Sequence, residues 1–170
     1  MAKRGVALIG MPGAGKSGVG KRMAQMLGRS FIDTDALVEK SEGMSVSDIF
    51  AQKGEPYFRA REREAVAAAV QKCAVISCGG GAALDEENAR MLKENCTVAY
   101  LAASLETLVA HVGNGAGRPL LHGDARKRTE ELLVAREGTY RRVADITVNT
   151  DGKSIEEVAA EIVRAVRRAR

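Results

Sequence analysis

Short apolar runs alternate with longer amphipathic stretches along the whole chain. The apolar runs have the length of buried strands and lie at residues 6–9, 31–32, 74–77, 97–101 and 146–148. The amphipathic stretches predict helices at residues 15–27, 36–40, 46–52, 58–71, 86–93, 105–112 and 127–142. A capping box of Ser154 and Glu157 predicts the start of a last helix, which runs to the basic C-terminus. This alternation predicts an α/β fold with three layers, in which helices cover both faces of a parallel sheet of about five strands.

Length and composition indicate one compact unit. A chain of 170 residues that is 45% apolar is sufficient for one sizeable core, so we expect a single domain over residues 1–170. Aromatic residues make up only 4% of the chain and Trp is absent, so the core must be mainly aliphatic. The net charge of +4 would suit an anionic ligand, but on charge alone we prefer a slightly basic soluble surface.

Several classes of partner are disfavoured by the sequence. No apolar run approaches the length of a membrane span, and the first one is too short for a signal peptide. Cys73, Cys78 and Cys96 follow no metal-binding spacing, and we interpret them as reduced, buried thiols of a cytoplasmic protein. The basic end at residues 166–170 has no interleaved aromatics, so we favour a solvated helix end over a nucleic-acid site. Because no exposed apolar stripe is evident, we expect a monomer.

The most specific signal is a glycine-rich loop, Gly10-Met-Pro-Gly-Ala-Gly-Lys16-Ser17, which fits G-x-x-x-x-G-K-[ST] without a mismatch. It follows a predicted strand and begins a predicted helix, as a phosphate-binding loop requires. Glycine torsions allow backbone N–H groups to turn inward, and the helix N-terminus adds partial positive charge. Lys16 would reach the β- and γ-phosphates of ATP, and the Ser17 hydroxyl would bind Mg²⁺. The predicted nucleotide-binding residues are Gly13, Ala14, Gly15, Lys16, Ser17 and Gly18.

The same stretch allows a second interpretation. Gly13, Gly15 and Gly18 also spell G-x-G-x-x-G, the fingerprint of dinucleotide binding, and Asp33 and Asp35 lie about 20 residues further on, where a ribose-binding acid would stand. Against this, a lysine would lie inside the fingerprint, where the pyrophosphate needs close packing. The chain is also too short to add a substrate domain. We therefore favour the phosphate loop.

Two segments follow other predicted strands, where ligands gather in parallel sheets. Asp33-Thr34-Asp35 offers two acids, one for a metal and one for a substrate hydroxyl, although Asp35 could also cap the next helix. Residues 79–81 are three consecutive glycines, which leave bare backbone able to approach a ligand closely. A simple tight turn would not need three glycines.

Two arginines are candidates for binding anions. Phe58-Arg59 begins a predicted helix, where the helix dipole disfavours Arg59 unless the side chain faces an anion. By contrast, Arg61 and Arg63 fit a solvated face. Residues 113–123 are rich in glycine and contain one proline, which predicts a mobile loop. Arg118 in this loop would stabilise charge on a transferring phosphoryl group while the loop excludes water.

In their order and spacing, these motifs resemble the shikimate kinase family over nearly the whole chain. The resemblance is carried by the phosphate loop, Asp33-Thr34-Asp35, Phe58-Arg59 with Glu62, Gly79-Gly80-Gly81, Arg118-Pro119-Leu120-Leu121, and Arg136 with Tyr140 before Ala144-Asp145. It implies a P-loop, nucleoside-monophosphate-kinase-like fold with a substrate-binding region at about 33–62 and a lid at about 112–124. It also implies Mg²⁺-dependent transfer of the ATP γ-phosphate to the 3-hydroxyl of shikimate, in aromatic amino acid biosynthesis.

The resemblance also implies roles for single residues. Asp35 would hold and polarise the reacting hydroxyl, with Lys16 and Arg118 as the other catalytic residues, while Asp33 would belong to the water shell of the metal or to the substrate side. The substrate carboxylate would be bound by Arg59 and Arg136, because bidentate guanidinium groups suit a carboxylate. The backbone of Gly79, Gly80 and Gly81 would line the substrate pocket. Without the resemblance, Arg136 could be a surface charge, and we interpret Tyr140 as a packing residue.

Two positions depart from the family pattern. Gly18 stands where the family usually has Thr, so a hydroxyl contact to the α-phosphate is absent and we expect weaker ATP binding. His111 stands seven residues before Arg118, where many relatives have an arginine that stacks on adenine. A neutral imidazole could stack there, or His111 could simply be a surface residue. Lys153 is a further candidate for the other face of the base.

Three alternatives remain at this stage. A kinase for gluconate or a nucleoside monophosphate would share the general fold, but the glycine triplet and the paired arginines argue against it. A dinucleotide-binding oxidoreductase fragment would bind its cofactor without Mg²⁺. A non-catalytic or nucleic-acid-binding ATPase is suggested only by the basic C-terminal end.

Overall fold

A parallel sheet forms the centre of the molecule. The structure is a computed structural model that describes residues 3–112 and 124–169, and in these residues the chain forms a five-stranded sheet of order β2-β3-β1-β4-β5. The strands are β1 (Gly5–Ile9), β2 (Phe31–Asp33), β3 (Val75–Ser77), β4 (Cys96–Ala102) and β5 (Ile146–Asn149). All four neighbouring pairs are parallel. The predicted α/β fold with about five parallel strands is therefore confirmed.

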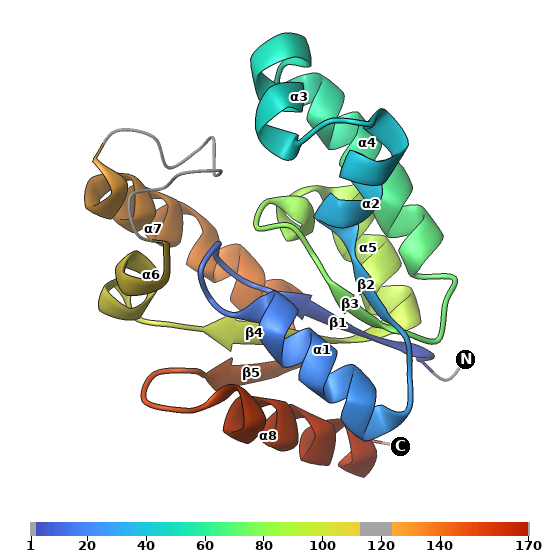
Figure 1. The fold of residues 1–170 in the computed structure, drawn as a ribbon. Helices are drawn as coiled ribbons and strands as arrows, with labels where there is room; N and C mark the ends of the chain where they lie inside the picture. Colours follow the sequence, from blue (N-terminus) through green and yellow to red (C-terminus); the bar gives the residue numbers. More distant parts are fainter. Residues whose placement is uncertain (1–2, 113–123, 170) are drawn as a thin grey trace.

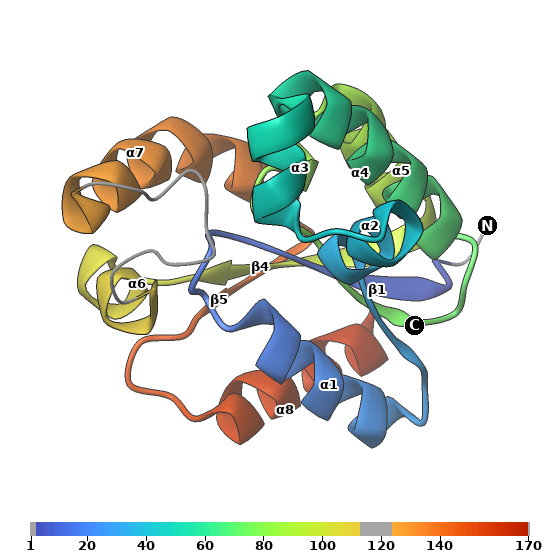
Figure 2. The same cartoon turned by 45° about the horizontal axis from the view of Figure 1, so that its top comes forward.

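Helices cover both faces of this sheet, which gives three layers. The helical elements are α1 (Lys16–Leu27), α2 (Thr34–Glu42), α3 (Val46–Lys53), α4 (Glu55–Ala69), the short 3₁₀ helix η1 (Ala82–Leu84), α5 (Glu86–Asn95), α6 (Leu105–Val112), α7 (Ala125–Val143) and α8 (Ile155–Arg168). Figures 1 and 2 show α1 and α8 side by side on one face of the sheet, and α4, α5 and α7 on the other. The connections between parallel strands thus run through helices, as parallel pairing requires.

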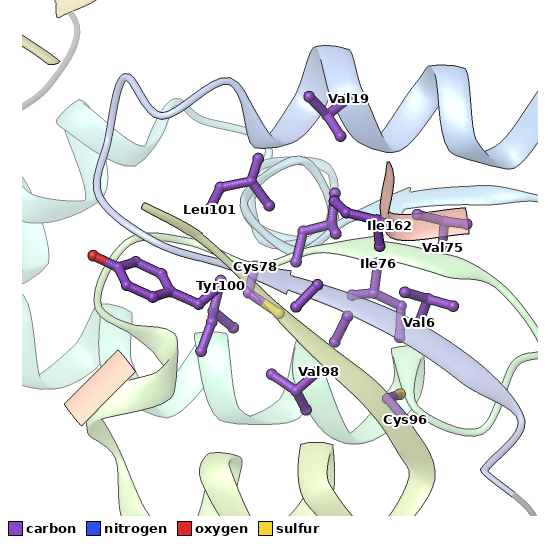
Figure 3. Close-up of a cluster of buried hydrophobic side chains, with 14 of the residues drawn as sticks. Val6, Val19, Val75, Ile76, Cys78, Cys96, Val98, Tyr100, Leu101 and Ile162 are labelled. Atoms are coloured by element: carbon purple, nitrogen blue, oxygen red, sulfur yellow. The ribbon is translucent and has the colours of Figure 1, made fainter. Parts of the chain in front are cut away.

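The core is densest around the central strand. Every residue of β1 is buried, which is typical of a parallel strand that is covered on both faces. Val6 lies opposite Val75 of β3 and Thr97 of β4, and the aliphatic side chains of these strands pack together (Figure 3). A second, smaller cluster of Val38, Ile49, Phe58 and Ala65 joins α2, α3 and α4. These three helices therefore pack around their own apolar centre.

One helix boundary differs from the prediction in a way that changes an argument. Helix α4 begins at Glu55, three residues before Phe58, because Gly54 with φ +82° ends α3 and Pro56 stands in the first turn of α4. Arg59 consequently lies beyond the first turn, so its predicted position at a helix start is wrong, and the argument from the helix dipole does not apply. Its position is explained instead by ion pairs with Glu55 and Glu62, described below.

Other local predictions can be compared directly with the structure. The capping box of Ser154 and Glu157 is confirmed, since both of its reciprocal hydrogen bonds are present. Cys78 and Cys96 are buried and free, as predicted, but Cys73 is exposed. Burial raises the pKa of the Cys96 thiol to about 11, so this thiol stays protonated near neutral pH. Across the described part of the chain, we find no helix with the length and apolar character needed to cross a membrane.

Candidate active site

A cleft of about 810 Å³ lies at the carboxyl ends of strands β1, β2 and β3. Its lining brings together nearly all of the site residues predicted from the sequence: Gly13, Gly15, Lys16, Ser17, Gly18, Asp33, Asp35, Arg59, Gly79, Gly80, Gly81, His111, Arg136 and Lys153. Ala14 is buried beside the cleft and does not line it. Arg118 and most of the predicted lid at 112–124 lie outside the described residues.

The phosphate loop has the backbone geometry that its glycines predict. Gly10, Gly13 and Gly15 have φ values of +145°, +88° and +89°, which disfavour any residue with a side chain. A Cβ at Gly10 would also lie 2.8 Å from the Leu101 carbonyl oxygen, so the loop passes tightly over β4. Lys16 begins α1, and its ammonium group donates to the carbonyl oxygens of Gly10 and Met11, at 2.7 and 2.9 Å. The loop therefore holds its lysine inside its own curve.

Three oxygen-bearing side chains meet just beyond the phosphate loop. The Ser17 hydroxyl donates to Asp33 Oδ2 at 2.9 Å, and the Ser77 hydroxyl lies 3.5 Å from Ser17 Oγ. Asp33 Oδ1 accepts from the Ala36 N–H, so Asp33, and not Asp35, caps α2. Hydroxyl and carboxylate oxygens are the ligands that Mg²⁺ takes, so this donor set fits the predicted metal. Sequence reasoning missed Ser77, although it pairs with Asp33 at the ends of β2 and β3.

Asp35 lies in the first turn of α2 with its carboxyl group in the cleft. Its Oδ1 atom is buried and has no hydrogen-bond partner among the described residues. Burial raises the pKa of Asp35; Asp33 acts in the same direction, whereas Lys16 and Arg59 lower the pKa. A buried carboxylate oxygen without a donor is costly unless a ligand supplies one. Asp35 is therefore prepared to accept a hydrogen bond from a bound hydroxyl.

Two arginines stand on the far side of this carboxyl group. Arg59 donates to Glu62 Oε1 at 2.8 Å and to Glu55 at 3.1 Å, so one of its partners is buried and the other is exposed. Burial raises the pKa of Glu62, which is 1% exposed, and Arg59 opposes that shift. Arg136 is only 6% exposed and lines the cleft, so its interpretation as a surface charge is wrong. A bound anion between the two guanidinium groups would meet two positive charges from different helices.

Each glycine of the triplet gives room to a different functional side chain. A Cβ at Gly79 would lie 2.6 Å from Asp35 Oδ1 and 2.8 Å from Glu62 Oε2. At Gly80 it would lie 2.8 Å from Pro12 and 3.3 Å from the Arg136 guanidinium, and at Gly81 it would overlap the guanidinium of Arg59. Real Cβ atoms do not approach other atoms so closely. The prediction that bare backbone is needed here is thus explained by the packing of acids and arginines against it.

Tyr140 has more than the packing role that the sequence suggests. Its ring stacks on Tyr100 with a centroid distance of 5.2 Å, and its hydroxyl donates to the Gly80 carbonyl oxygen. The hydroxyl is also 3.9 Å from the Met11 sulfur, in the phosphate loop. Tyr140 therefore links the glycine triplet to the segment that carries the phosphate loop. No pattern in the sequence pointed to this contact, because its two ends are 60 residues apart.

The nucleotide side of the cleft contains His111 and Lys153, the two candidates for contact with the adenine. His111 has its Nδ1 atom 3.0 Å from the Gly13 carbonyl oxygen, so the imidazole N–H donates to the phosphate loop. Lys153 lies at the same end and forms an ion pair with Glu161 at 2.8 Å. Ile155, the first residue of α8, is half-exposed and faces Gly18, where a Cβ would lie 3.0 Å from its Cδ1 atom. His111 and Lys153 are thus both placed beside the phosphate loop.

Fold and site together define a class of protein. A glycine-rich loop between β1 and α1, with a lysine in its curve and oxygen ligands at the end of β2, is the site of P-loop nucleotide-binding proteins. The acids and arginines in the same cleft provide a second subsite for a small polar anion. The class is therefore a P-loop kinase of small molecules.

Comparison with known proteins identifies the family. The shikimate kinase family model matches residues 12–167. The chain is 46% identical to a shikimate kinase of Salinispora arenicola, over 91% of this chain and 93% of that protein. The solved structure of a shikimate kinase from Acinetobacter baumannii in complex with shikimate has a TM-score of 0.95 at 31% identity, over 99% of this chain and 96% of the other. A shikimate kinase structure from Aquifex aeolicus has a TM-score of 0.85 at 33% identity, with 96% of each chain covered. This chain belongs to the shikimate kinase family.

Proposed function

We propose that this protein transfers the γ-phosphate of ATP to the 3-hydroxyl of shikimate, a step of aromatic amino acid biosynthesis. The observation that carries the proposal is the unpartnered Asp35 carboxylate oxygen, which lies in one cleft with the phosphate loop and with Arg59 and Arg136. Family membership supports the same reaction, and the A. baumannii relative is described in complex with shikimate.

The substrate side follows from the charge and size of shikimate, a small carboxylate with three hydroxyls. Arg59 and Arg136 bind its carboxylate, and residues 79–81 line the pocket with backbone. Asp35 accepts the proton of the reacting hydroxyl as the hydroxyl oxygen bonds to the γ-phosphorus and the bond to the β–γ bridging oxygen breaks. The leaving group is ADP. Residues 33–62 thereby form the substrate-binding region of a single kinase domain.

The nucleotide side uses residues that are already in position. Members of this family use ATP, whose phosphates fit the N–H groups and helix dipole at the start of α1, with Lys16 neutralising charge. Ser17 would hold Mg²⁺ and Asp33 would bind the water molecules of the ion, which when bound would neutralise phosphate charge. His111 and Lys153 border the adenine and Gly18 lies beside the α-phosphate, whereas Arg118, the other expected phosphate ligand, is outside the described residues. Because the reaction consumes ATP, we propose a cytoplasmic location. We also propose that the protein is a monomer whose partners are small molecules.

Measuring ADP release with a panel of hydroxy acids tests this function. We expect turnover with shikimate, little with gluconate, and none with any acceptor after Mg²⁺ is removed with a chelator, because uncompensated phosphate charge opposes the attack. Restored turnover on adding Mg²⁺ is the control for chelator effects. Turnover on gluconate without turnover on shikimate would overturn the substrate assignment, and chelator-resistant turnover would overturn the role of the metal.

A change at Gly18 tests the nucleotide subsite. Gly18→Thr supplies the hydroxyl that the family usually has there, and one hydrogen bond of about 1 kcal/mol predicts an ATP KM lower by about fivefold. The new side chain meets the Ile155 Cδ1 atom, which is the end of a flexible, half-exposed side chain and is able to move aside. Gly18→Ala is the matched control, because it adds the Cβ without the hydroxyl. An unchanged ATP KM in Gly18→Thr would contradict the prediction.

A further inference from the structure

The middle residue of Asp33-Thr34-Asp35 has a contact that the proposed chemistry does not yet use. Thr34 is fully buried, and its hydroxyl oxygen accepts a hydrogen bond from the Gly79 N–H at 3.0 Å. Strands β2 and β3 pair through Asp33 and Ser77, but β2 then turns into α2. The Gly79 N–H therefore has no further strand residue to bond, and the Thr34 side chain takes the place of the missing backbone acceptor.

This hydrogen bond decides which side of Gly79 faces the acids. The N–H points to Thr34, while the Cα side lies against Asp35 Oδ1 and Glu62 Oε2, at 2.6 and 2.8 Å from the position of a Cβ. Both of these carboxylate oxygens are buried and unpartnered among the described residues. Gly79 thus packs against two unpartnered acceptors, while its own N–H is bonded to Thr34.

We infer that Thr34 is a positioning residue for phosphoryl transfer: by binding the Gly79 N–H, it keeps the Asp35 carboxylate free for the substrate hydroxyl. The inference rests on the proposed function. Without the Thr34 acceptor, the partly buried Gly79 N–H turns to another available oxygen, because an unsatisfied donor is costly. Asp35 Oδ1 is such an oxygen, and once it is occupied the substrate hydroxyl must compete for it. The loss then falls on the chemical step and leaves the nucleotide subsite unchanged.

Two substitutions separate the acceptor from the shape of the side chain. Thr34→Val keeps the volume and removes the acceptor, and we expect kcat with shikimate to fall by about tenfold with an unchanged ATP KM. Thr34→Ser keeps the hydroxyl and should retain kcat within about twofold of wild type. Hydrogen exchange at the Gly79 amide should be faster in Thr34→Val than in wild type or Thr34→Ser. The matched control is Thr147→Val in β5, where the side chain is exposed.

The outcomes separate this inference from the proposed function. A Thr34→Val variant with wild-type kcat, or a Thr34→Ser variant that loses as much as Thr34→Val, would overturn the inference. So would unchanged Gly79 exchange, which is measured without any substrate. Absence of shikimate turnover in the wild type would count against the proposed function alone, because the exchange experiment still tests the hydrogen bond.

Discussion

Replacing Asp35 with Asn is expected to lower kcat with shikimate by about 10²–10⁴-fold while ATP still binds. Asn has the shape of Asp but does not take up a proton, so the reacting hydroxyl keeps its proton as it approaches the γ-phosphorus. The amide also places either an oxygen or a donor NH₂ where Asp35 Oδ1 now stands unpartnered. Steady-state kinetics with shikimate and calorimetric titration with ATP measure the two quantities separately.

The choice of Asp35 over its neighbour follows from their partners. Glu62 is also buried in the cleft, but one of its oxygens already accepts from Arg59 at 2.8 Å. Asp35 has no such ion pair among the described contacts and lies nearer the phosphate loop in sequence and fold, where Lys16 acts on its pKa. Glu62 therefore orients Arg59, and Asp35 is the acid that remains free to accept the proton of the substrate hydroxyl.

The control for Asp35→Asn removes a carboxylate that does not line the cleft. Glu64→Gln lies on α4, where Glu64 is exposed and pairs only with Arg61 among the described residues, so kcat should be unchanged. Full activity in Asp35→Asn would contradict its role as proton acceptor, and loss of ATP binding in that variant would place Asp35 in the nucleotide subsite instead.

Local sequence signals were sufficient to predict the strands, the phosphate loop and the acids that follow β2. The loop was predictable because its glycines have torsions that other residues avoid, as at Gly13 and Gly15. What could not be derived was which of two nearby acids caps α2, since either side chain is able to accept a backbone N–H. The structure assigns the cap to Asp33, and this leaves Asp35 free.

Contacts between segments that are distant in the sequence could not be predicted either. Nothing in the neighbouring sequence predicts the contacts of Ser77, Tyr140 and Thr34, because their partners are 60, 60 and 45 residues away. The start of α4 was misplaced because the apolar periodicity of the helix begins later than its backbone, which Gly54 and Pro56 determine. Helix boundaries depend on such terminal residues more than on the pattern inside the helix.

Replacing Gly79 with Ala is expected to reduce kcat/KM for shikimate by about 10²-fold. The new methyl group pushes the Asp35 carboxylate out of position, and a small displacement of a catalytic group is enough to cause such a loss. The Cβ would stand 2.6 Å from Asp35 Oδ1 and 2.8 Å from Glu62 Oε2, two buried atoms that must shift to admit it. Overpacking of this kind costs about 1–3 kcal/mol of stability, so a lower Tm should accompany the loss. Shikimate kinetics and thermal unfolding measure both effects.

The matched control is Gly138→Ala in α7, where a Cβ meets nothing within 4 Å. Alanine is the better helix former by about 0.5–1 kcal/mol, so this variant should have a raised Tm and unchanged kinetics. The ATP affinity of Gly79→Ala shows whether its lower kcat/KM comes from the substrate side of the cleft alone. The three atoms nearest to the methyl group all belong to the substrate-side acids, so ATP should bind as in the wild type. A variant that keeps kcat/KM would mean that Asp35 and Glu62 move aside freely, and the glycine triplet would then not be explained by their packing.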